Sequence, residues 1–214
     1  MRGRNLLLNE EKKQKLQSIK KSKLFILKQT KSVIIIIKLL SETRLEVNSV
    51  EEKLTIRMAT TDQSDIDALH KYIYKLGRYQ KMAETSVTIT KETLKEQIGN
   101  KTLESVIAFL DDEPVGIGLF YTLASGFTGR TSMFLNIYYV EENLRGKGIG
   151  KAIMAYLSKI SLERGYERIE WLCLNWNEPS LRFYRGIQSR EIDTVITFRL
   201  MPDDMKRLNE EVKA

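Results

Sequence analysis

The spacing of hydrophobic and polar positions from residue 51 onward predicts alternating strands and helices. Strand-type patterns lie at 53–58, 105–110, 115–121, 133–140, 168–174 and 194–200. Helix-type patterns lie at 66–76, 90–98, 149–160, 178–185 and 201–212. This order predicts an α/β (α+β) domain in which helices flank one mixed, mostly antiparallel sheet.

Residues at the ends of these segments support the boundaries. The stretch 60–64 supplies helix caps, and Asp65 and Asp67 fall in the first helical turn, where the helix dipole favours acidic side chains. The stretch 111–114 has the composition of a turn. Pro179 suits the first turn of the helix that follows it.

The composition of the 214 residues, with 42% hydrophobic and 29% charged side chains, is typical of a folded globular protein. The single cysteine, Cys173, excludes an intramolecular disulfide and a cysteine-based zinc site. The single histidine, His70, excludes a two-histidine metal site and disfavours a Ser/His/Asp triad. We therefore expect no metal and a reducing, cytoplasmic location.

The formal net charge of +7 is distributed unevenly along the chain. Residues 1–50 hold 12 Lys and Arg against 4 Asp and Glu, whereas residues 51–214 hold 23 against 24. The main domain is therefore nearly neutral, and a nucleic-acid partner is not expected. The uninterrupted apolar run at 33–37 is far shorter than the roughly 20 residues that span a membrane, so we expect no membrane partner either.

The basic N-terminal extension, residues 1–50, allows several interpretations. It is typical of a solvated, disordered tail, but a basic arm that binds nucleic acid or a membrane surface fits the same charge run. A third hypothesis is a mis-assigned start, because Leu45-Glu46-Val47 permits a ribosome-binding sequence and Val50 permits a GUG codon. The intact mass of the native protein tests this, and a mass for all 214 residues would refute it.

A glycine-rich loop, Arg145–Lys151, lies between a predicted strand and a predicted amphipathic helix. Glycine lets the backbone approach a ligand, and the free N–H groups of a helix start favour an anion such as pyrophosphate. The spacing differs from the dinucleotide fingerprint GxGxxG, and the first glycine of a P-loop is missing. A plain glycine-rich turn remains the alternative if the loop is considered alone.

The loop and a second segment together resemble a known family. Arg145-Gly-Lys-Gly-Ile-Gly150 resembles motif A, Arg/Gln-x-x-Gly-x-Gly/Ala, of the GNAT N-acetyltransferases, and the segment 175–184 resembles their motif B. The resemblance covers residues 54–210 and is closest to the spermidine/spermine (diamine) N-acetyltransferase branch, through Gly77-Arg78-Tyr79, the segment 119–122 and the Trp-Asn-Glu-Pro-Ser run. It implies the GNAT fold, with central strands that splay apart.

The resemblance implies that acetyl-CoA is the co-substrate and lies in the gap between the splayed strands. Main-chain groups of 138–140 would pair with pantetheine, and the amides of the glycine-rich loop would hold the pyrophosphate. The implied cofactor-binding residues are Tyr138, Tyr139, Val140, Arg145, Gly146, Lys147, Gly148, Ile149, Gly150, Lys151, Asn177 and Ser180.

The resemblance further implies that the acceptor amine attacks the thioester directly and that Tyr184 is the general acid that protonates the leaving thiolate. A free tyrosine titrates near about 10 and is protonated at neutral pH. No single base stands out among Glu141, Glu142 and Glu170. Cys173 offers a covalent route, but a strand cysteine without a neighbouring histidine is typically a core residue.

The resemblance implies Tyr79, Gln80 and Asn136 as acceptor residues, and at Gln80 and Asn136 the sequence departs from the polyamine branch. The branch has a Glu-Asp pair where this chain has Asn136-Ile137, and an acidic residue where it has Gln80. Because carboxylates bind polycations, a less charged small primary amine is expected. Acetylation of a protein or aminoacyl-tRNA, and a non-catalytic CoA-binding module, remain alternatives. The resemblance also implies a homodimer.

Overall fold

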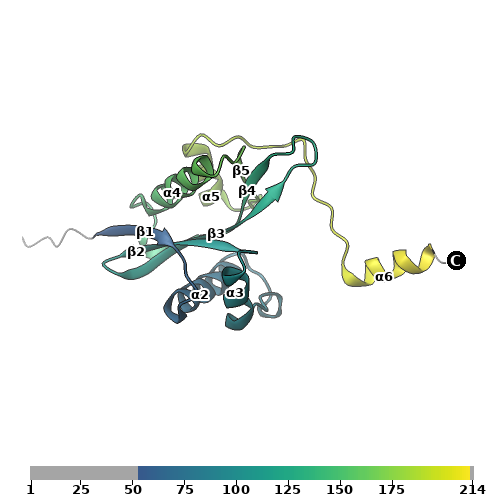
Figure 1. Cartoon of the computed structure of the whole chain (residues 1–214), viewed down its shortest axis with the longest axis horizontal. Coiled ribbons are helices and arrows are strands. Elements are labelled where there is room, and N and C mark those ends of the chain that lie inside the picture. Colours follow the sequence, from purple (N-terminus) through teal and green to yellow (C-terminus); the bar gives the residue numbers. More distant parts are fainter. Residues whose placement is uncertain (1–52, 213–214) are drawn as a thin grey trace, which may run out of the picture. The chain divides into compact units, whose positions relative to one another are not determined.

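The computed structural model describes residues 53–212, and the predictions for residues 1–50 lie outside this range. Its strands are β1 (Leu54–Met58), β2 (Glu104–Leu110), β3 (Glu113–Ala124), β4 (Thr131–Val140) and β5 (Ile169–Trp171) (Figure 1). Its helices are α2 (Gln63–Tyr79), α3 (Lys91–Gly99), α4 (Ile149–Glu163), α5 (Glu178–Gly186) and α6 (Pro202–Glu211). Two short 3-10 helices, η1 (Glu84–Ser86) and η2 (Glu142–Leu144), were not predicted.

The strands form one sheet in the order β1-β2-β3-β4-β5. The first four strands are antiparallel neighbours, and β5 pairs in parallel with β4. This parallel ladder joins only Met133–Leu135 to β5, although β4 continues to Val140. The second half of β4 is therefore free on the side of β5, which confirms the predicted mixed sheet with splayed strands.

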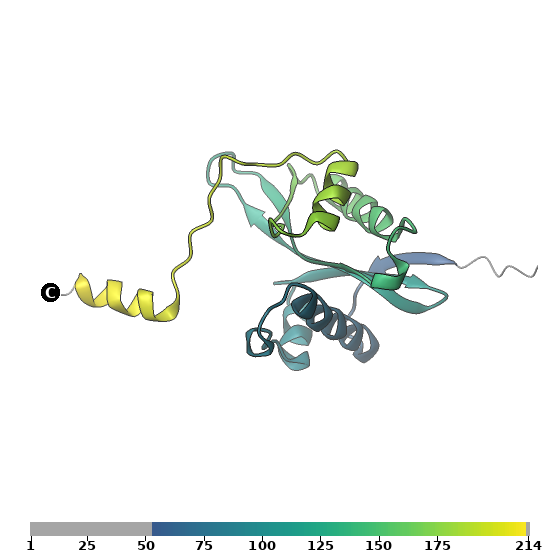
Figure 2. The same cartoon turned by 180° about the vertical axis from the view of Figure 1, so that it is seen from behind.

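Helices cover both faces of the sheet, with α2 and α3 on one face and α4 and α5 on the other (Figures 1 and 2). Apolar positions three and four residues apart on α2 and α4 make this packing favourable. The core under α2 and α3 is formed by residues such as Ile66, Leu69, Tyr72, Leu94, Ile107 and Ile117. The core under α4 is formed by residues such as Val106, Phe120, Met133, Ile153 and Leu157.

An ion pair fixes the start of α2 against β1. Both oxygens of the buried Asp65 carboxylate accept hydrogen bonds of 2.7 Å from Arg57, and Thr60 N donates a further bond of 2.8 Å. The sequence predicted only a helix-dipole role for this carboxylate. In the structure Asp65 mainly joins two elements, and Arg57 holds the pKa of Asp65 below its usual range.

Two predicted strands differ from the structure. The segment 168–174 forms a strand only at β5, because β4 turns away from it after Leu135. The strand predicted at 194–200 is wrong: this segment has no regular structure, and its apolar side chains are exposed. Among residues 53–212 this segment pairs with no strand, although the outer edge of β5 is open, and an isolated strand is not stable in water.

No helix among residues 53–212 is long and apolar enough to cross a membrane.

Candidate active site

The site begins where β4 and β5 separate. Beyond Leu135, β4 has no ladder partner on the side of β5, and its residues up to Val140 keep hydrogen-bonding groups available at that edge. Two tyrosines occupy this stretch: Tyr139 is buried among the residues under α2, and Tyr138 packs against the core under α4. The splay therefore forms an opening that reaches both layers.

The glycine-rich loop follows this free end of β4 and starts α4. Gly146 and Gly148 adopt φ of 80° and 86°, a region that glycine enters without strain. Gly148 is the N-cap residue and provides no side-chain cap to the first N–H groups of α4. Lys147 and Lys151 are exposed beside them. The loop thus presents uncapped amides and positive charge, an arrangement suited to binding a phosphate group.

Gly150 allows the loop to lie against β4. A Cβ atom at this position would lie 2.6 Å from Tyr138 Oη, closer than side-chain atoms pack. The Tyr138 hydroxyl is buried and has no hydrogen-bond partner among the described residues, and burial raises its pKa above the usual range. The ring of Tyr138 stacks on Phe183 at a centroid distance of 5.9 Å, which joins β4 to α5.

Tyr184 lies between the two splayed strands. Its ring centroid is 5.1 Å from that of Trp171 on β5 and 6.3 Å from that of Tyr138 on β4. Burial, reinforced by Cys173, raises the pKa of Tyr184 above its ordinary value. Among residues 53–212 the Tyr184 hydroxyl forms no hydrogen bond. The phenol is therefore protonated at neutral pH and free to donate.

Asn177 bridges the opening from the side of α5. It is buried, and its Oδ1 caps α5 by accepting a 3.4 Å bond from Ser180 N. The same oxygen accepts a 3.1 Å bond from Tyr79 Oη at the end of α2. The structure therefore brings together Tyr79 and Asn177, which the sequence assigned separately to the acceptor and the cofactor.

Arg145 also reaches across the opening. Its guanidinium carbon lies 4.6 Å from the ring centroid of Tyr79 and 5.4 Å from that of Tyr139, within the range of cation–π attraction. Its Nε donates a 3.1 Å hydrogen bond to Val140 O at the free end of β4. Arg145 thus folds back over the strand end while remaining exposed to solvent.

A cavity of about 480 Å³ opens between α2 and the end of β4. Its lining residues are Lys75, Arg78, Tyr79, Tyr139, Glu141, Glu142 and Asn143. The Glu141 carboxylate accepts a 2.5 Å hydrogen bond from Lys75 Nζ and lies 3.8 Å from Lys71 Nζ. Sequence reasoning assigned no role to Lys75 or Arg78. Helical spacing could have indicated them, because positions 75, 78 and 79 share one side of α2.

The three residues implied in acceptor binding are not gathered in one place. Tyr79 lines the larger cavity, whereas Gln80 lines a second, mostly apolar cavity of about 270 Å³ together with Ile137 and Val87. Asn136 is exposed on β4 and lines neither cavity.

Other sequence candidates are less suited to chemistry. Glu170 pairs with Arg168 at 3.0 Å on the surface. Burial raises the pKa of Cys173, which disfavours the thiolate that a covalent route requires. Among the described residues no group of His, Cys, Asp and Glu side chains is arranged to hold a metal ion.

Comparisons with known proteins identify the class. The model of the acetyltransferase (GNAT) family matches residues 73–187, more than half of the chain. A thialysine N-epsilon-acetyltransferase of Caenorhabditis elegans is 29% identical over 127 residues, which cover 59% of this chain and 78% of that protein. A human spermidine/spermine N(1)-acetyltransferase-like protein is 23% identical over 131 residues, covering 58% and 19% of the two chains.

The fold is also that of known acetyltransferase structures. An aminoglycoside acetyltransferase from an uncultured soil metagenomic sample superposes with a TM-score of 0.60 at 20% identity, covering 69% of this chain and 95% of that one. The chain belongs to the acetyltransferase (GNAT) family, near the spermidine/spermine branch, as predicted. It is an acyltransferase enzyme.

Proposed function

We propose that the enzyme transfers an acetyl group from acetyl-CoA to the primary amine of a small molecule by direct attack, with Tyr184 as the general acid. The observation that carries this proposal is the position of Tyr184 in the opening between β4 and β5, with a raised pKa and no competing hydrogen bond among the described residues. The thialysine-acetylating relative modifies the side-chain amine of an amino acid, which supports a small-molecule acceptor.

The residues around the opening fit acetyl-CoA. The uncapped start of α4 and its two glycines in the left-handed region suit a pyrophosphate, and the free edge of β4 at 138–140 suits an amide-bearing arm. In this proposal, Arg145–Lys151 hold the phosphates, and Asn177 and Ser180 contact the arm. Acetyl-CoA supplies the activated acyl group as a thioester.

The transfer needs one bond to form and one to break. The acceptor nitrogen forms a bond to the carbonyl carbon, the carbon–sulfur bond breaks, and the Tyr184 hydroxyl gives its proton to the departing thiolate. The tyrosinate then regains a proton from the amine, directly or through water. In this proposal a main-chain amide at Tyr139 or Val140 stabilises the carbonyl oxygen. Glu141 is less suited to act as the base, because Lys75 and Lys71 already pair with it.

The Tyr184→Phe variant tests the role of the phenol. We expect kcat to fall about 100-fold or more with an unchanged KM for acetyl-CoA, because general-acid catalysis contributes roughly 10²–10⁴. Tyr74→Phe is the matched control, because Tyr74 lies on α2 beside His70 and away from Tyr184. Equal kcat values for Tyr184→Phe and the wild type would refute the assignment. A raised KM for acetyl-CoA alone would instead make Tyr184 a binding residue.

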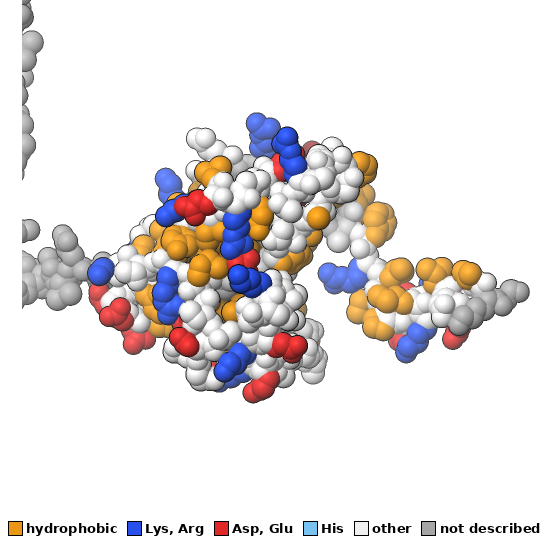
Figure 3. Space-filling model, in the orientation of Figure 1, with side chains coloured by type: hydrophobic (Ala, Val, Ile, Leu, Met, Phe, Trp, Pro, Cys, Tyr) orange, Lys and Arg blue, Asp and Glu red, His pale blue; other side chains and the backbone are white. Residues whose placement is uncertain are grey.

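We also propose a cytoplasmic homodimer. The cytoplasmic location rests on the single cysteine. The dimer is supported by the C-terminal segment, where Ile192, Val195, Ile196, Phe198 and Leu200 are all more than half exposed. Apolar side chains also gather along one face of α6 (Figure 3). Such a group of exposed apolar side chains is typical of an interaction surface, and a second copy of the chain would cover it.

A further inference from the structure

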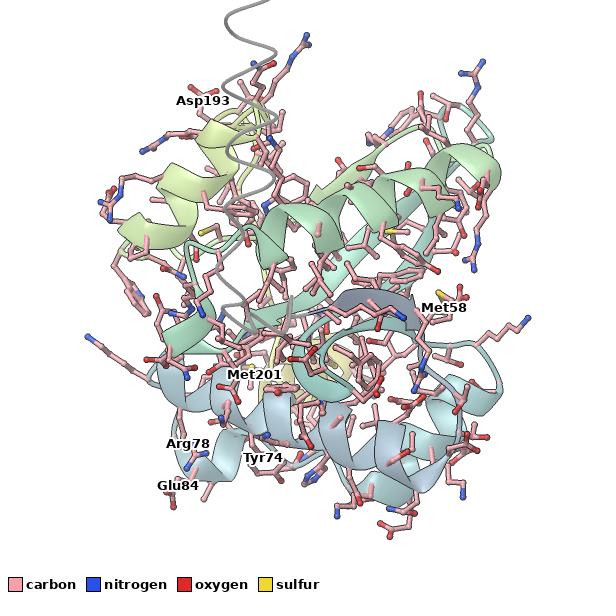
Figure 4. The ribbon with its side chains drawn as sticks, turned by 90° about the vertical axis from the view of Figure 1, so that its left-hand side faces the viewer. Met58, Tyr74, Arg78, Glu84, Asp193 and Met201 are labelled. Carbon is pink, nitrogen blue, oxygen red and sulfur yellow. The ribbon has the colours of Figure 1, made fainter. Side chains whose placement is uncertain are left out.

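The larger cavity holds charges of both signs on two different elements. Lys75 and Arg78 enter it from α2, whereas Glu141 and Glu142 enter it from the end of β4 and from η2. Figure 4 shows Arg78 near the C-terminal end of α2. Because this end of α2 also carries Tyr79, which bonds to Asn177, the cavity adjoins the opening that contains Tyr184.

Within the described part of the chain, only one of the two acids is paired with a lysine. Glu141 lies 2.5 Å from Lys75 and 3.8 Å from Lys71. By contrast, neither Arg78 nor Glu142 has an ion-pair partner within 4.0 Å among residues 53–212. The cavity therefore presents one guanidinium and one carboxylate that are both available to a ligand.

These two charges lie around the same aromatic ring. Burial raises the pKa of Tyr139 and the negative charges of Glu141 and Glu142 raise it further, while Arg145 and Arg78 act in the opposite direction. The exposed side chains of Arg78 and Glu142 therefore lie within electrostatic reach of Tyr139, and all three residues line the cavity.

We infer that this cavity binds the zwitterionic head group of an α-amino acid acceptor, with Arg78 on the α-carboxylate and Glu142 on the α-ammonium group. The inference rests on the proposed function and specifies its acceptor class. Arginine binds a carboxylate through two parallel charge-assisted hydrogen bonds, whereas a polyamine has no anionic group for it. Arg145, stacked on two of the lining tyrosines, adds positive charge that further disfavours a polycation.

In this inference the acceptor amine lies on the side chain of the amino acid, because the cavity adjoins the start of α5 whereas Tyr184 lies near its end. Tyr79 contacts Asn177 at the start of α5, and Tyr184 follows seven residues later, about 10 Å along a helix that rises roughly 1.5 Å per residue. Helical side chains lean toward the N-terminus, so the phenol of Tyr184 points back toward Asn177. In this inference the side chain of an acceptor such as ornithine or lysine extends toward Tyr184, whereas the α-amine stays with Glu142.

The test compares amino acids with the diamines that lack only the carboxylate. Initial rates are measured for ornithine against putrescine and for lysine against cadaverine. We expect kcat/KM of the wild type to favour each amino acid about tenfold or more. In Arg78→Gln the KM for the amino acids should rise about tenfold or more with kcat nearly unchanged, while the diamines change little. Arg78→Glu should favour the diamines.

Control measurements distinguish a loss of head-group binding from a general effect of charge, a loss of folding and a loss of acetyl-CoA binding. Arg130→Gln, at an exposed arginine in the loop after β3, should leave both substrate classes unchanged. Thermal unfolding of each variant checks that the fold is intact. An unchanged ratio of amino acid to diamine in Arg78→Gln would overturn the inference. A raised KM for acetyl-CoA in this variant would also overturn it and assign the cavity to the co-substrate.

A binding measurement distinguishes a failure of the proposed acetyl transfer from a failure of the head-group inference. If the wild type acetylated no amine, binding of lysine to the CoA-loaded protein would be followed by the fluorescence of Trp176, whose ring lies 6.5 Å from that of Tyr79. Saturable binding that is weakened in Arg78→Gln would support the head-group site without catalysis. Absence of binding to the wild type would overturn the inference as well.

Discussion

Arg57 and Asp65 position the helix that carries Tyr79. The Asp65 carboxylate is buried, while the Arg57 side chain is half-exposed. We expect Arg57→Ala to lower the free energy of unfolding by about 1–2 kcal/mol, because it leaves a buried carboxylate with fewer partners, although water partly replaces an exposed guanidinium. Urea unfolding at neutral pH measures this change. Arg168→Ala, at a surface pair with Glu170, is the control and should change stability little.

The same pair predicts a pH dependence. Arg57 lowers the pKa of Asp65 in the folded protein below its unfolded value of about 3.9. A depressed carboxyl pKa stabilises the fold above the unfolded pKa, and this contribution is lost as the pH falls through the folded pKa. We therefore expect the difference between the wild type and Arg57→Ala to shrink below about pH 4. A difference that stays constant down to acid pH would contradict the assignment.

Single residues also show what the sequence alone could and could not indicate. The glycines of the loop and Tyr184 were found because their spacing resembles family motifs. Arg78 was noted only as part of a family-like run, and Lys75 was not noted. The Tyr79–Asn177 bond could not be predicted, because these residues are distant in the chain and meet only in the folded protein. The pairing of Glu141 with two lysines of α2 was equally invisible, and it changes the choice of base.

At the scale of elements, the contact between β4 and α4 depends on one glycine. We expect Gly150→Ala to destabilise the protein by about 1–3 kcal/mol and to weaken acetyl-CoA binding, because the new Cβ would lie 2.6 Å from Tyr138 Oη. Unfolding curves and a binding titration measure both effects.

The Tyr138→Phe variant tests whether the Tyr138 hydroxyl causes the loss of stability in Gly150→Ala. It removes a buried hydroxyl that has no partner among the described residues, so alone it should be neutral or slightly stabilising. In the double variant with Gly150→Ala it should restore most of the lost stability. A double variant as unstable as Gly150→Ala would show that the hydroxyl is not the source of the clash.

The order and type of most elements were predictable from hydrophobic spacing, because each packs one face against the sheet core. Thr90, proposed as the start of a helix, caps α3 by accepting a 3.1 Å bond from Thr93 N. The shortness of β5 and the absence of a strand at 194–200 were not predictable. An alternating pattern shows that a strand is favourable, but not whether the segment pairs with an open edge such as that of β5.

At the scale of the whole molecule, the exposed C-terminal segment predicts self-association. The wild type should sediment as a dimer, and Phe198→Asp should shift it to a monomer, because a buried unpaired carboxylate is costly. Phe127→Asp is the matched control, since Phe127 is exposed in the loop after β3 and lies outside this segment. A monomeric wild type at every concentration tested, or equal behaviour of the two variants, would refute the dimer.

Acetyl transfer to a small amine is most directly tested by identifying the product. The purified full chain is incubated with acetyl-CoA and one amine at a time from a panel of lysine, ornithine, their diamines, spermidine and a peptide, and the mixture is analysed by mass spectrometry beside an assay of free thiol. We predict that an amino acid with a side-chain amine gains one acetyl group in equal amount to the thiol released. Thiol release without an acetylated small amine, or acetylation of the peptide alone, would contradict the proposed function.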